Sequence, residues 1–265
     1  MVERLISLAS GVVPELDPIE TFKVAIKTGY NAVGLMVIPE RDLNSSTIKE
    51  LTIMSKNENI KILDIEVLML EPGDFNDDHL RILDLGGEIG AMHSLTVSND
   101  SNINKTSEKF NKICNHARDC GIKSVFEFLM ITKYRNLDDA INVLDLTESQ
   151  NKGILIDTLH FQRANHKASD IKNYDKILFP YLQLCDGEVD LLNKKYEDYL
   201  DDALNGRSAP GEGNLPLEDI IKEFSLSLPF SLEVRSKYYR ENYKNVYDRA
   251  SKILSKTLKY LDTEI

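Results

Sequence analysis

The sequence predicts an α/β fold of the (β/α)8 barrel type, in which a single domain covers residues 1–265. Strand-like and helix-like segments alternate eight times, and the composition does not change between the two halves. Hydrophobic residues make up 42% and charged residues 28% of the chain, as is usual for a globular protein. A doubly wound open sheet is the rival, but the first strand is not followed by a glycine-rich phosphate loop.

Eight short apolar runs predict the strands of the barrel. These runs are rich in Val, Ile, Leu and Phe and are too short for helices, which is typical of buried parallel strands. The expected strands are 5–10, 32–36, 62–67, 91–97, 123–128, 153–157, 180–186 and 230–234.

Helical segments fill the intervals between these runs. Asp17 as a cap, Pro18 in the first turn and Gly29 as a stop mark the first helix, and Gly121 ends another. The expected helices are 17–29, one that opens at 44, 75–89, 104–120, 137–148, 168–174, 216–224 and 242–261. A polar insertion at 187–215, with a helix around 190–203, interrupts the last part of the pattern.

Composition excludes several classes of protein. The net charge of −11 opposes binding to a nucleic-acid backbone, which needs clustered Lys and Arg. No apolar run has the length of a membrane span, and the start of the chain lacks the apolar stretch of a signal peptide. Cys114, Cys120 and Cys185 show no CxxC spacing, so we expect reduced thiols in a cytoplasmic protein.

Four polar residues each interrupt an apolar run near the C-terminal end of a predicted strand. They are Glu127 in VFEFL, Asp157 in ILIDTLH, Gln183 in YLQLCDG and Glu233 in FSLEV. Because side chains alternate along a strand, Ser231, Glu233 and Arg235 share one face. A lone carboxylate buried there would be unfavourable by several kcal/mol. Four such residues at the same end of the barrel therefore suggest one shared cation.

The donor types indicate which cation this would be. Glu127, Asp157, Gln183 and Glu233 offer only oxygen atoms, which suit Mn²⁺ or Mg²⁺. Zinc fits less well, because it favours imidazole and thiolate ligands. The alternative is that each acid forms a buried ion pair with its own Arg or Lys.

Other residues are candidates for contact with a substrate. His160, three residues after Asp157, could donate to a hydroxyl group or move a proton, and is otherwise a structural loop histidine. His93 and Glu66 could line the same mouth, and a buried hydrogen bond is the alternative for each. Arg163 and Arg207 could clamp an anionic substrate, or be solvated.

The pattern resembles the xylose-isomerase-like TIM barrels, a group of sugar isomerases, sugar epimerases and endonuclease IV. The resemblance covers nearly the whole chain. It implies a metal site made by Glu127, Asp157, Gln183 and Glu233, with His160 beside it. Gln183 replaces the usual metal histidine, which is similar to the branch of 3-dehydroshikimate dehydratases. The segments LQLCDG, RSAPGEGNLPL and SLEV are also similar to a branch of sugar phosphate isomerases or epimerases.

The resemblance implies a metal-dependent isomerase or epimerase that acts on a sugar, sugar phosphate or polyhydroxy acid through an enediolate. Glu127 and Glu233 would then be base and acid on opposite sides of the ligand. A lyase of the 3-dehydroshikimate dehydratase type is the alternative, and a barrel that binds a metabolite without turnover is another. DNA repair is disfavoured by the acidic charge and the few histidines. The expected partner is a small anionic or polyhydroxylated substrate, without nucleic acid or membrane; a homo-oligomer stays open.

Overall fold

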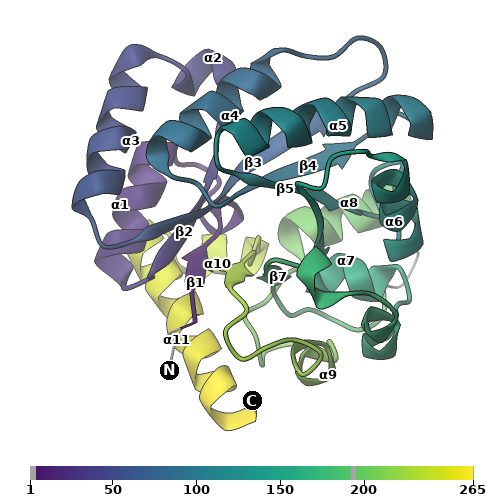
Figure 1. The fold of residues 1–265 in the computed structure, drawn as a ribbon. Coiled ribbons are helices and arrows are strands. Elements are labelled where there is room, and N and C mark those ends of the chain that lie inside the picture. The colour runs from purple at the N-terminus through teal and green to yellow at the C-terminus, as the bar shows by residue number, and fades with distance from the viewer. Residues whose placement is uncertain (1–3, 192–194, 265) are drawn as a thin grey trace.

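The computed structural model describes residues 4–191 and 195–264, and positions 1–3, 192–194 and 265 lie outside that description. Its eight parallel strands pair in chain order and close into a barrel through β8 and β1, with helices around the outside (Figure 1). The predicted (β/α)8 barrel is therefore confirmed. The strands are β1 (Ile6–Leu8), β2 (Ala32–Met36), β3 (Lys61–Leu70), β4 (His93–Ser98), β5 (Lys123–Glu127), β6 (Lys152–Asp157), β7 (Leu182–Leu184) and β8 (Phe230–Leu232).

The helices begin and end largely at the signals in the sequence. Asp17 accepts a hydrogen bond from the Glu20 amide at 2.9 Å, and Gly29, at φ 87°, ends the first helix in the left-handed region. The helices are α1 (Pro18–Thr28), α2 (Pro39–Asp42), α3 (Ser45–Asn57), α4 (Asp78–Ile89), α5 (Ile103–Asp119), α6 (Leu137–Leu146), α7 (Thr158–Arg163), α8 (Tyr196–Asn205), α9 (Leu217–Ile221), α10 (Lys237–Asn242) and α11 (Val246–Glu264).

Three parts of the element prediction need correction. The short helices α2 and α7 were not expected, and residues 168–173 form a 3-10 helix where an α-helix was expected. Helix α10, which ends at Asn242, was not expected either, and the closing helix α11 starts at Val246 and not at residue 242. The insertion has its helix, α8, but this begins at Tyr196, and residues 192–194 of the expected range lie outside the described residues.

The apolar core has two layers, one inside the barrel and one between the strands and the helices. The outer layer is the larger and includes Phe22, Phe110 and Phe126. The inner layer consists of Ala32, Leu63, Leu95, Val97, Val125, Leu155 and Tyr181. Successive residues of a strand point to opposite layers, so a residue two positions from an inner residue also faces the barrel axis.

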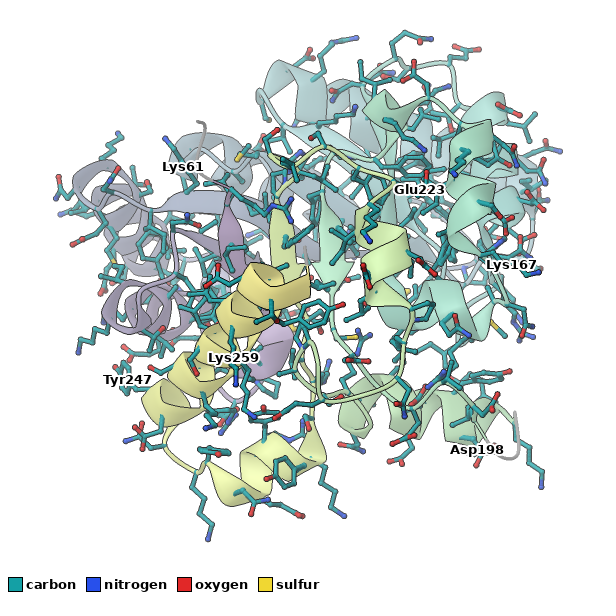
Figure 2. All side chains as sticks on the ribbon, turned by 90° about the horizontal axis from the view of Figure 1, so that it is seen from below. Lys61, Lys167, Asp198, Glu223, Tyr247 and Lys259 are labelled. Carbon is teal, nitrogen blue, oxygen red and sulfur yellow. The ribbon has the colours of Figure 1, made fainter. Side chains whose placement is uncertain are left out.

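The outer surface is charged. Figure 2 shows Lys61, Lys167 and Lys259 in well-separated parts of the molecule, so these basic side chains form no common patch. All three are exposed. Among the helices of residues 4–191 and 195–264, none combines the length and the apolar character needed to cross a lipid bilayer.

Candidate active site

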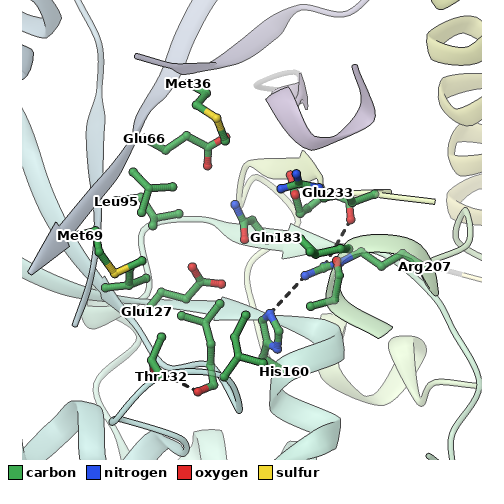
Figure 3. A pocket seen from close by; sticks show the side chains of 17 residues that line it. Met36, Glu66, Met69, Leu95, Glu127, Thr132, His160, Gln183, Arg207 and Glu233 are labelled. Atoms are coloured by element: carbon green, nitrogen blue, oxygen red, sulfur yellow. Dashed lines mark hydrogen bonds between the residues drawn. The ribbon is translucent and has the colours of Figure 1, made fainter. Parts of the chain in front are cut away.

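A cavity of about 210 Å³ lies where the strands end, and three of the four expected metal ligands line it. Glu127 is the last residue of β5, Gln183 lies within β7, and Glu233 directly follows β8. Val125 and Tyr181, two residues before Glu127 and Gln183, belong to the inner core, and strand alternation therefore turns the polar groups inward. Figure 3 shows Glu127, Gln183 and Glu233 around one space.

Asp157, the fourth expected ligand, lies just behind this cavity. It ends β6 and caps α7, since its Oδ1 accepts hydrogen bonds from the amides of Leu159 (2.9 Å) and His160 (3.1 Å). This cap places His160 on the cavity wall. Ligand atoms of Glu127, Asp157 and His160 all lie within 4.8 Å of one another, so the structure brings these three residues together.

Arg207 supplies the main positive charge beside these residues. Its Nη1 lies 2.5 Å from Asp157 Oδ2, and the side chains of both residues are buried. Burial favours the neutral carboxyl group, but Arg207 and the two amide hydrogen bonds hold the pKa of Asp157 below its ordinary value. Burial lowers the pKa of His160 to about 4, so its imidazole is neutral, and its Nε2 accepts a hydrogen bond from Arg207 Nη2 at 3.2 Å.

Arg207, expected to clamp a substrate, lines the cavity, but the structure also gives it a role within the fold. Its Nε donates to Ala203 O (3.0 Å), and its Nη1 also contacts Cys185 Sγ (3.2 Å) and Glu233 O (3.3 Å). The guanidinium therefore fastens the insertion to the strand ends. For Asp157 the structure shows the alternative that the sequence left open, which is a buried ion pair between the acid and its own arginine.

The other acids of the site have no such partner. The side chain of Glu127 makes no hydrogen bond or ion pair with another described residue, and the enclosed Oε2 of Glu233 has no hydrogen-bond partner among them. Burial, and then repulsion from Asp157, raises the pKa of Glu127 well above its ordinary value. Burial, and then the charge of Glu66, raises the pKa of Glu233 to about 7.

Glu66 adds a further carboxyl group to the same cavity, as expected from the sequence. It accepts a hydrogen bond from Ser10 Oγ. Burial, and then the neighbouring Asp64, raises its pKa to about 7. Glu66, Glu127 and Glu233 thus share a small space in which their charged forms are disfavoured. A divalent cation would neutralise such acids, and the residues of this site whose ligand atoms lie within 4.8 Å of one another are Glu127, Asp157 and His160, without Glu66 or Glu233.

Two glycines, which the sequence did not single out, make room for buried acids. A Cβ on Gly11 would lie 2.0 Å from Glu233 Oε1, and a Cβ on Gly34 would lie 2.3 Å from Asp64 Oδ1. Neither position has the positive φ that favours glycine, so the space taken by the carboxylate is the reason for the missing side chain.

Two residues predicted to contact a substrate, His93 and Arg163, do not line the cavity. His93 is the first residue of β4, at the end of the strand away from the cavity, and does not line it. Its Nδ1 donates to Leu63 O at 2.9 Å, because the carbonyl can only accept, and its ring lies on Tyr181 with centroids 4.8 Å apart. Arg163 is buried away from the cavity, where its Nε donates to Asp202 Oδ2 at 2.7 Å.

Sequence reasoning also missed residues that do line the cavity. Arg235 lies two residues after Glu233 and faces the same space, as strand alternation allowed. Most of the cavity wall is aliphatic. The two-residue alternation of side chains along each strand could have identified only some of these lining residues. The apolar lining residues are Met36, Val67, Met69, Leu95, Val97, Leu129, Ile131, Ala203 and Leu204.

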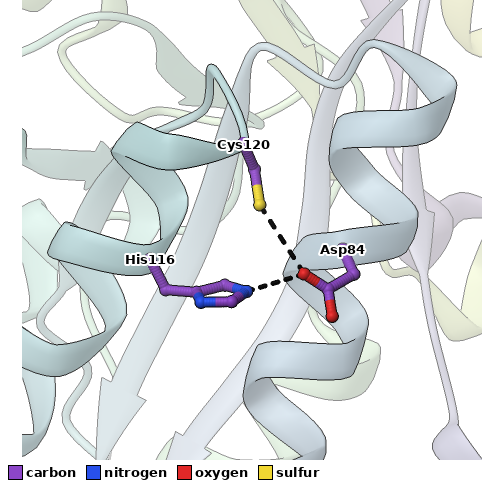
Figure 4. A group of neighbouring side chains, drawn as sticks. All are labelled: Asp84, His116 and Cys120. Carbon is purple, nitrogen blue, oxygen red and sulfur yellow. Dashed lines mark hydrogen bonds and ion pairs between the residues drawn. The ribbon is translucent and has the colours of Figure 1, made fainter.

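A second group of metal-type ligands lies on the outer surface, between α4 and α5 (Figure 4). His116 Nε2 lies 2.7 Å from Asp84 Oδ1, and Cys120 Sγ lies 3.8 Å from the same oxygen. Asp84 is exposed, so this contact between neighbouring helices is a surface interaction of little energetic weight.

Comparisons with known proteins agree with this fold. Residues 22–257 match the family model described as xylose isomerase-like TIM barrel, whereas no curated protein matches the chain. The crystal structure of IolI protein with a zinc atom has a TM-score of 0.79 at 16% identity, covering 98% of this chain and 99% of that one.

Two further solved structures have named reactions. The probable 3-DHS dehydratase AsbF from Bacillus anthracis has a TM-score of 0.70 at 14% identity, covering 95% of this chain and 98% of its own. D-psicose 3-epimerase from Clostridium cellulolyticum H10, solved with D-tagatose, has a TM-score of 0.70 at 12% identity, covering 97% and 99%. At these identities the likeness shows the fold.

Proposed function

The chain belongs to the xylose isomerase-like TIM barrel family, and from this premise we propose that it is a divalent-metal-dependent isomerase or epimerase. Its substrate would carry a hydroxyl group next to a carbonyl group, as a sugar, a sugar phosphate or a polyhydroxy acid does. The epimerase among the structural neighbours supports this reaction class.

One observation carries the proposal, and it concerns Glu127 and Glu233. Both carboxyl groups face the cavity, and they enter it from different sides (Figure 3). The carboxyl group of Glu127 and the enclosed Oε2 of Glu233 have no hydrogen-bond partner among the described residues. A pair of unengaged acids on two sides of a ligand is what proton transfer at a carbon centre requires.

The same residues would hold the metal. A divalent ion bound by Glu127, Asp157, Gln183 and Glu233 would act as a Lewis acid towards the substrate oxygens. The oxygen donors favour Mn²⁺ or Mg²⁺. Zinc is the alternative, in view of the zinc atom in the IolI structure. Asp157 would share its Oδ2 with Arg207, and the side chain of Gln183 makes no hydrogen bond to another described residue, which leaves its amide oxygen available.

The residues of the chain would then divide the work of an epimerisation. Glu127 would remove the proton from the carbon beside the carbonyl group, and Glu233 would return a proton on the opposite face. His160, as a neutral imidazole held by Arg207, would contact a substrate hydroxyl. The aliphatic wall would exclude water from the exposed carbanion.

A lyase of the 3-dehydroshikimate dehydratase type is the second candidate, because the wall of the cavity is mostly aliphatic. Such a wall suits a less hydroxylated product better than a sugar. AsbF among the neighbours agrees with this candidate. The two reactions are separable, since a dehydratase yields a conjugated product that absorbs in the ultraviolet and an epimerase does not.

Metal titration tests the site independently of the substrate. Metal-free protein should take up one Mn²⁺ in electron paramagnetic resonance or calorimetric titrations, and Glu127→Gln and Asp157→Asn should each abolish this uptake. The matched control is His116→Gln with Cys120→Ser, which removes the surface group and should leave the barrel site intact. Uptake that survives Glu127→Gln but disappears in the control would contradict the assignment.

Hydrogen exchange tests the reaction. With Mn²⁺ in deuterium oxide, at least one hydroxycarbonyl compound among D-tagatose, D-psicose and 3-dehydroshikimate should gain deuterium beside the carbonyl group, as followed by mass spectrometry. Glu233→Gln should block epimerisation. A ketose that binds without any exchange, in protein with full metal content, would identify a non-catalytic binding protein instead.

A further inference from the structure

Arg235 is a cavity residue whose donors are unused. It lines the cavity and is half-buried, and no hydrogen bond or ion pair joins it to another of the described residues. Its charge acts at a distance on Glu66 and Glu233. A guanidinium with free donors inside a small cavity is available to a ligand.

The other arginine of the cavity cannot take this role. Arg207 uses its Nε and both Nη atoms in contacts with Asp157, His160 and neighbouring acceptors. Its pair with Asp157 is buried on both sides, and exchanging that partner for a ligand would leave a buried carboxylate unpaired. Among the residues that line the cavity, Arg235 is therefore the available anion-binding group.

The rest of the lining restricts what the anion is attached to. Nine of the seventeen lining residues are aliphatic or Met, and the polar ones gather around the acids. Each hydroxyl group pressed against such a wall would lose its hydrogen bonds to water without replacement. The cavity, at about 210 Å³, is also smaller than the pockets that hold drug-sized ligands.

We propose that Arg235 binds the carboxylate of a small hydroxy acid or keto acid, whose body lies against the aliphatic wall and whose reacting carbon lies between Glu127 and Glu233. The inference rests on the proposed function and narrows its substrate class from sugars, sugar phosphates and polyhydroxy acids to carboxylic acids alone. A carboxylate matches the planar guanidinium in two parallel hydrogen bonds. A phosphate dianion would bring more charge than one arginine offsets beside three acids.

Binding measurements on matched ligand pairs test the proposal. The probes are shikimate, quinate and 3-dehydroshikimate, each compared with its methyl ester, and D-tagatose as a neutral polyol. Calorimetry with the Mn²⁺-loaded protein should show that at least one acid binds more tightly than its ester. Arg235→Gln should weaken the binding of that acid about 10- to 100-fold and leave the ester and D-tagatose within about twofold.

Two further variants separate direct contact from general electrostatics. Lys237→Gln makes the same change of charge at an exposed residue two positions away and should leave every affinity unchanged. Arg235→Lys should retain part of the preference for the acid. Unchanged Mn²⁺ affinity and thermal midpoint would show that Arg235→Gln is folded with its metal site intact.

Several outcomes would overturn the proposal. The absence of an acid-over-ester preference in all three pairs would do so, and so would an equal loss of affinity for acid and ester in Arg235→Gln. The proposed function can fail separately: acid binding that depends on Arg235 without any turnover would retain this inference and refute the enzyme. Turnover of D-tagatose that does not depend on Arg235 would support the proposed enzyme function and refute this inference.

Discussion

Arg207 joins the insertion to the end of β6 through Asp157, with 2.5 Å between Nη1 and Oδ2 and both side chains buried. Breaking a buried pair from one side leaves an uncompensated charge. In metal-free protein we therefore expect Arg207→Met to lower the free energy of unfolding by about 3–5 kcal/mol, measured by urea denaturation. The double variant with Asp157→Asn should recover part of this loss. A single-variant loss below about 1 kcal/mol would place the pair among solvated surface bridges.

Gly11→Ala should damage the site without damaging the fold. The added methyl group would overlap Glu233 Oε1, whose side chain would have to turn away from the cavity. We expect the affinity for Mn²⁺ to fall at least about tenfold, as it does when residues that support metal ligands are replaced. The free energy of unfolding in urea should change only slightly. Gly187→Ala is the matched control, because its methyl group would meet only ordinary contacts, the nearest being Leu159 at 3.4 Å. Equal Mn²⁺ affinity in the two variants would contradict this prediction.

Asp64→Asn should change how stability depends on pH. Burial raises the pKa of Asp64 to about 7 from 3.8, against the hydrogen bond that Tyr181 donates to it at 2.8 Å. The folded protein therefore binds more protons than the unfolded chain between about pH 4 and 7, and its free energy of unfolding falls as pH rises through this window.

Asp64→Asn lacks this titrating group. Its free energy of unfolding should therefore rise relative to that of the wild type as pH increases. The difference between pH 5 and 8 should be on the order of 2 kcal/mol in urea denaturation of metal-free protein. Parallel stability curves for the two proteins would show that Asp64 does not titrate in this range.

Arg163→Gln should loosen the insertion. The guanidinium holds three acceptors of this segment, Asp202, Val189 O (3.0 Å) and Glu188 O (2.7 Å). Limited proteolysis should cut the variant faster within residues 187–207, because local opening no longer breaks a buried pair. Arg118→Gln, which removes an exposed pair with Asp119, is the control and should be cut like the wild type. Cutting at distant sites at the same rate would indicate global unfolding instead.

The sequence predicted the barrel and the inward direction of the acids for one reason, which is the two-residue period of a strand. Val125 and Glu127 must share a face whatever else the fold does, and the same holds for Tyr181 and Gln183. Period alone does not say how far along the barrel a residue lies. The prediction that His93 lines the cavity is wrong for this reason, because His93 begins β4 and the cavity lies at the other end of that strand.

Long-range pairing was beyond the sequence. Arg163 meets Asp202 across 39 residues, and Arg207 meets Asp157 across 50, and no local pattern shows which acid an arginine will find. Helix α7 was missed for a local reason. The apolar run marks Asp157 as a strand end, but its side chain also caps the helix that follows.

The segment between β7 and α9 has two roles in the site. Arg207 from this segment balances the charge of Asp157, and Ala203 and Leu204, one turn earlier, form part of the aliphatic wall. An engineer who exchanged this loop to admit a new ligand would also alter the electrostatics of the reacting groups. Retuning the selectivity of this barrel without harming its chemistry should therefore begin on the opposite wall, at Met36 or Met69.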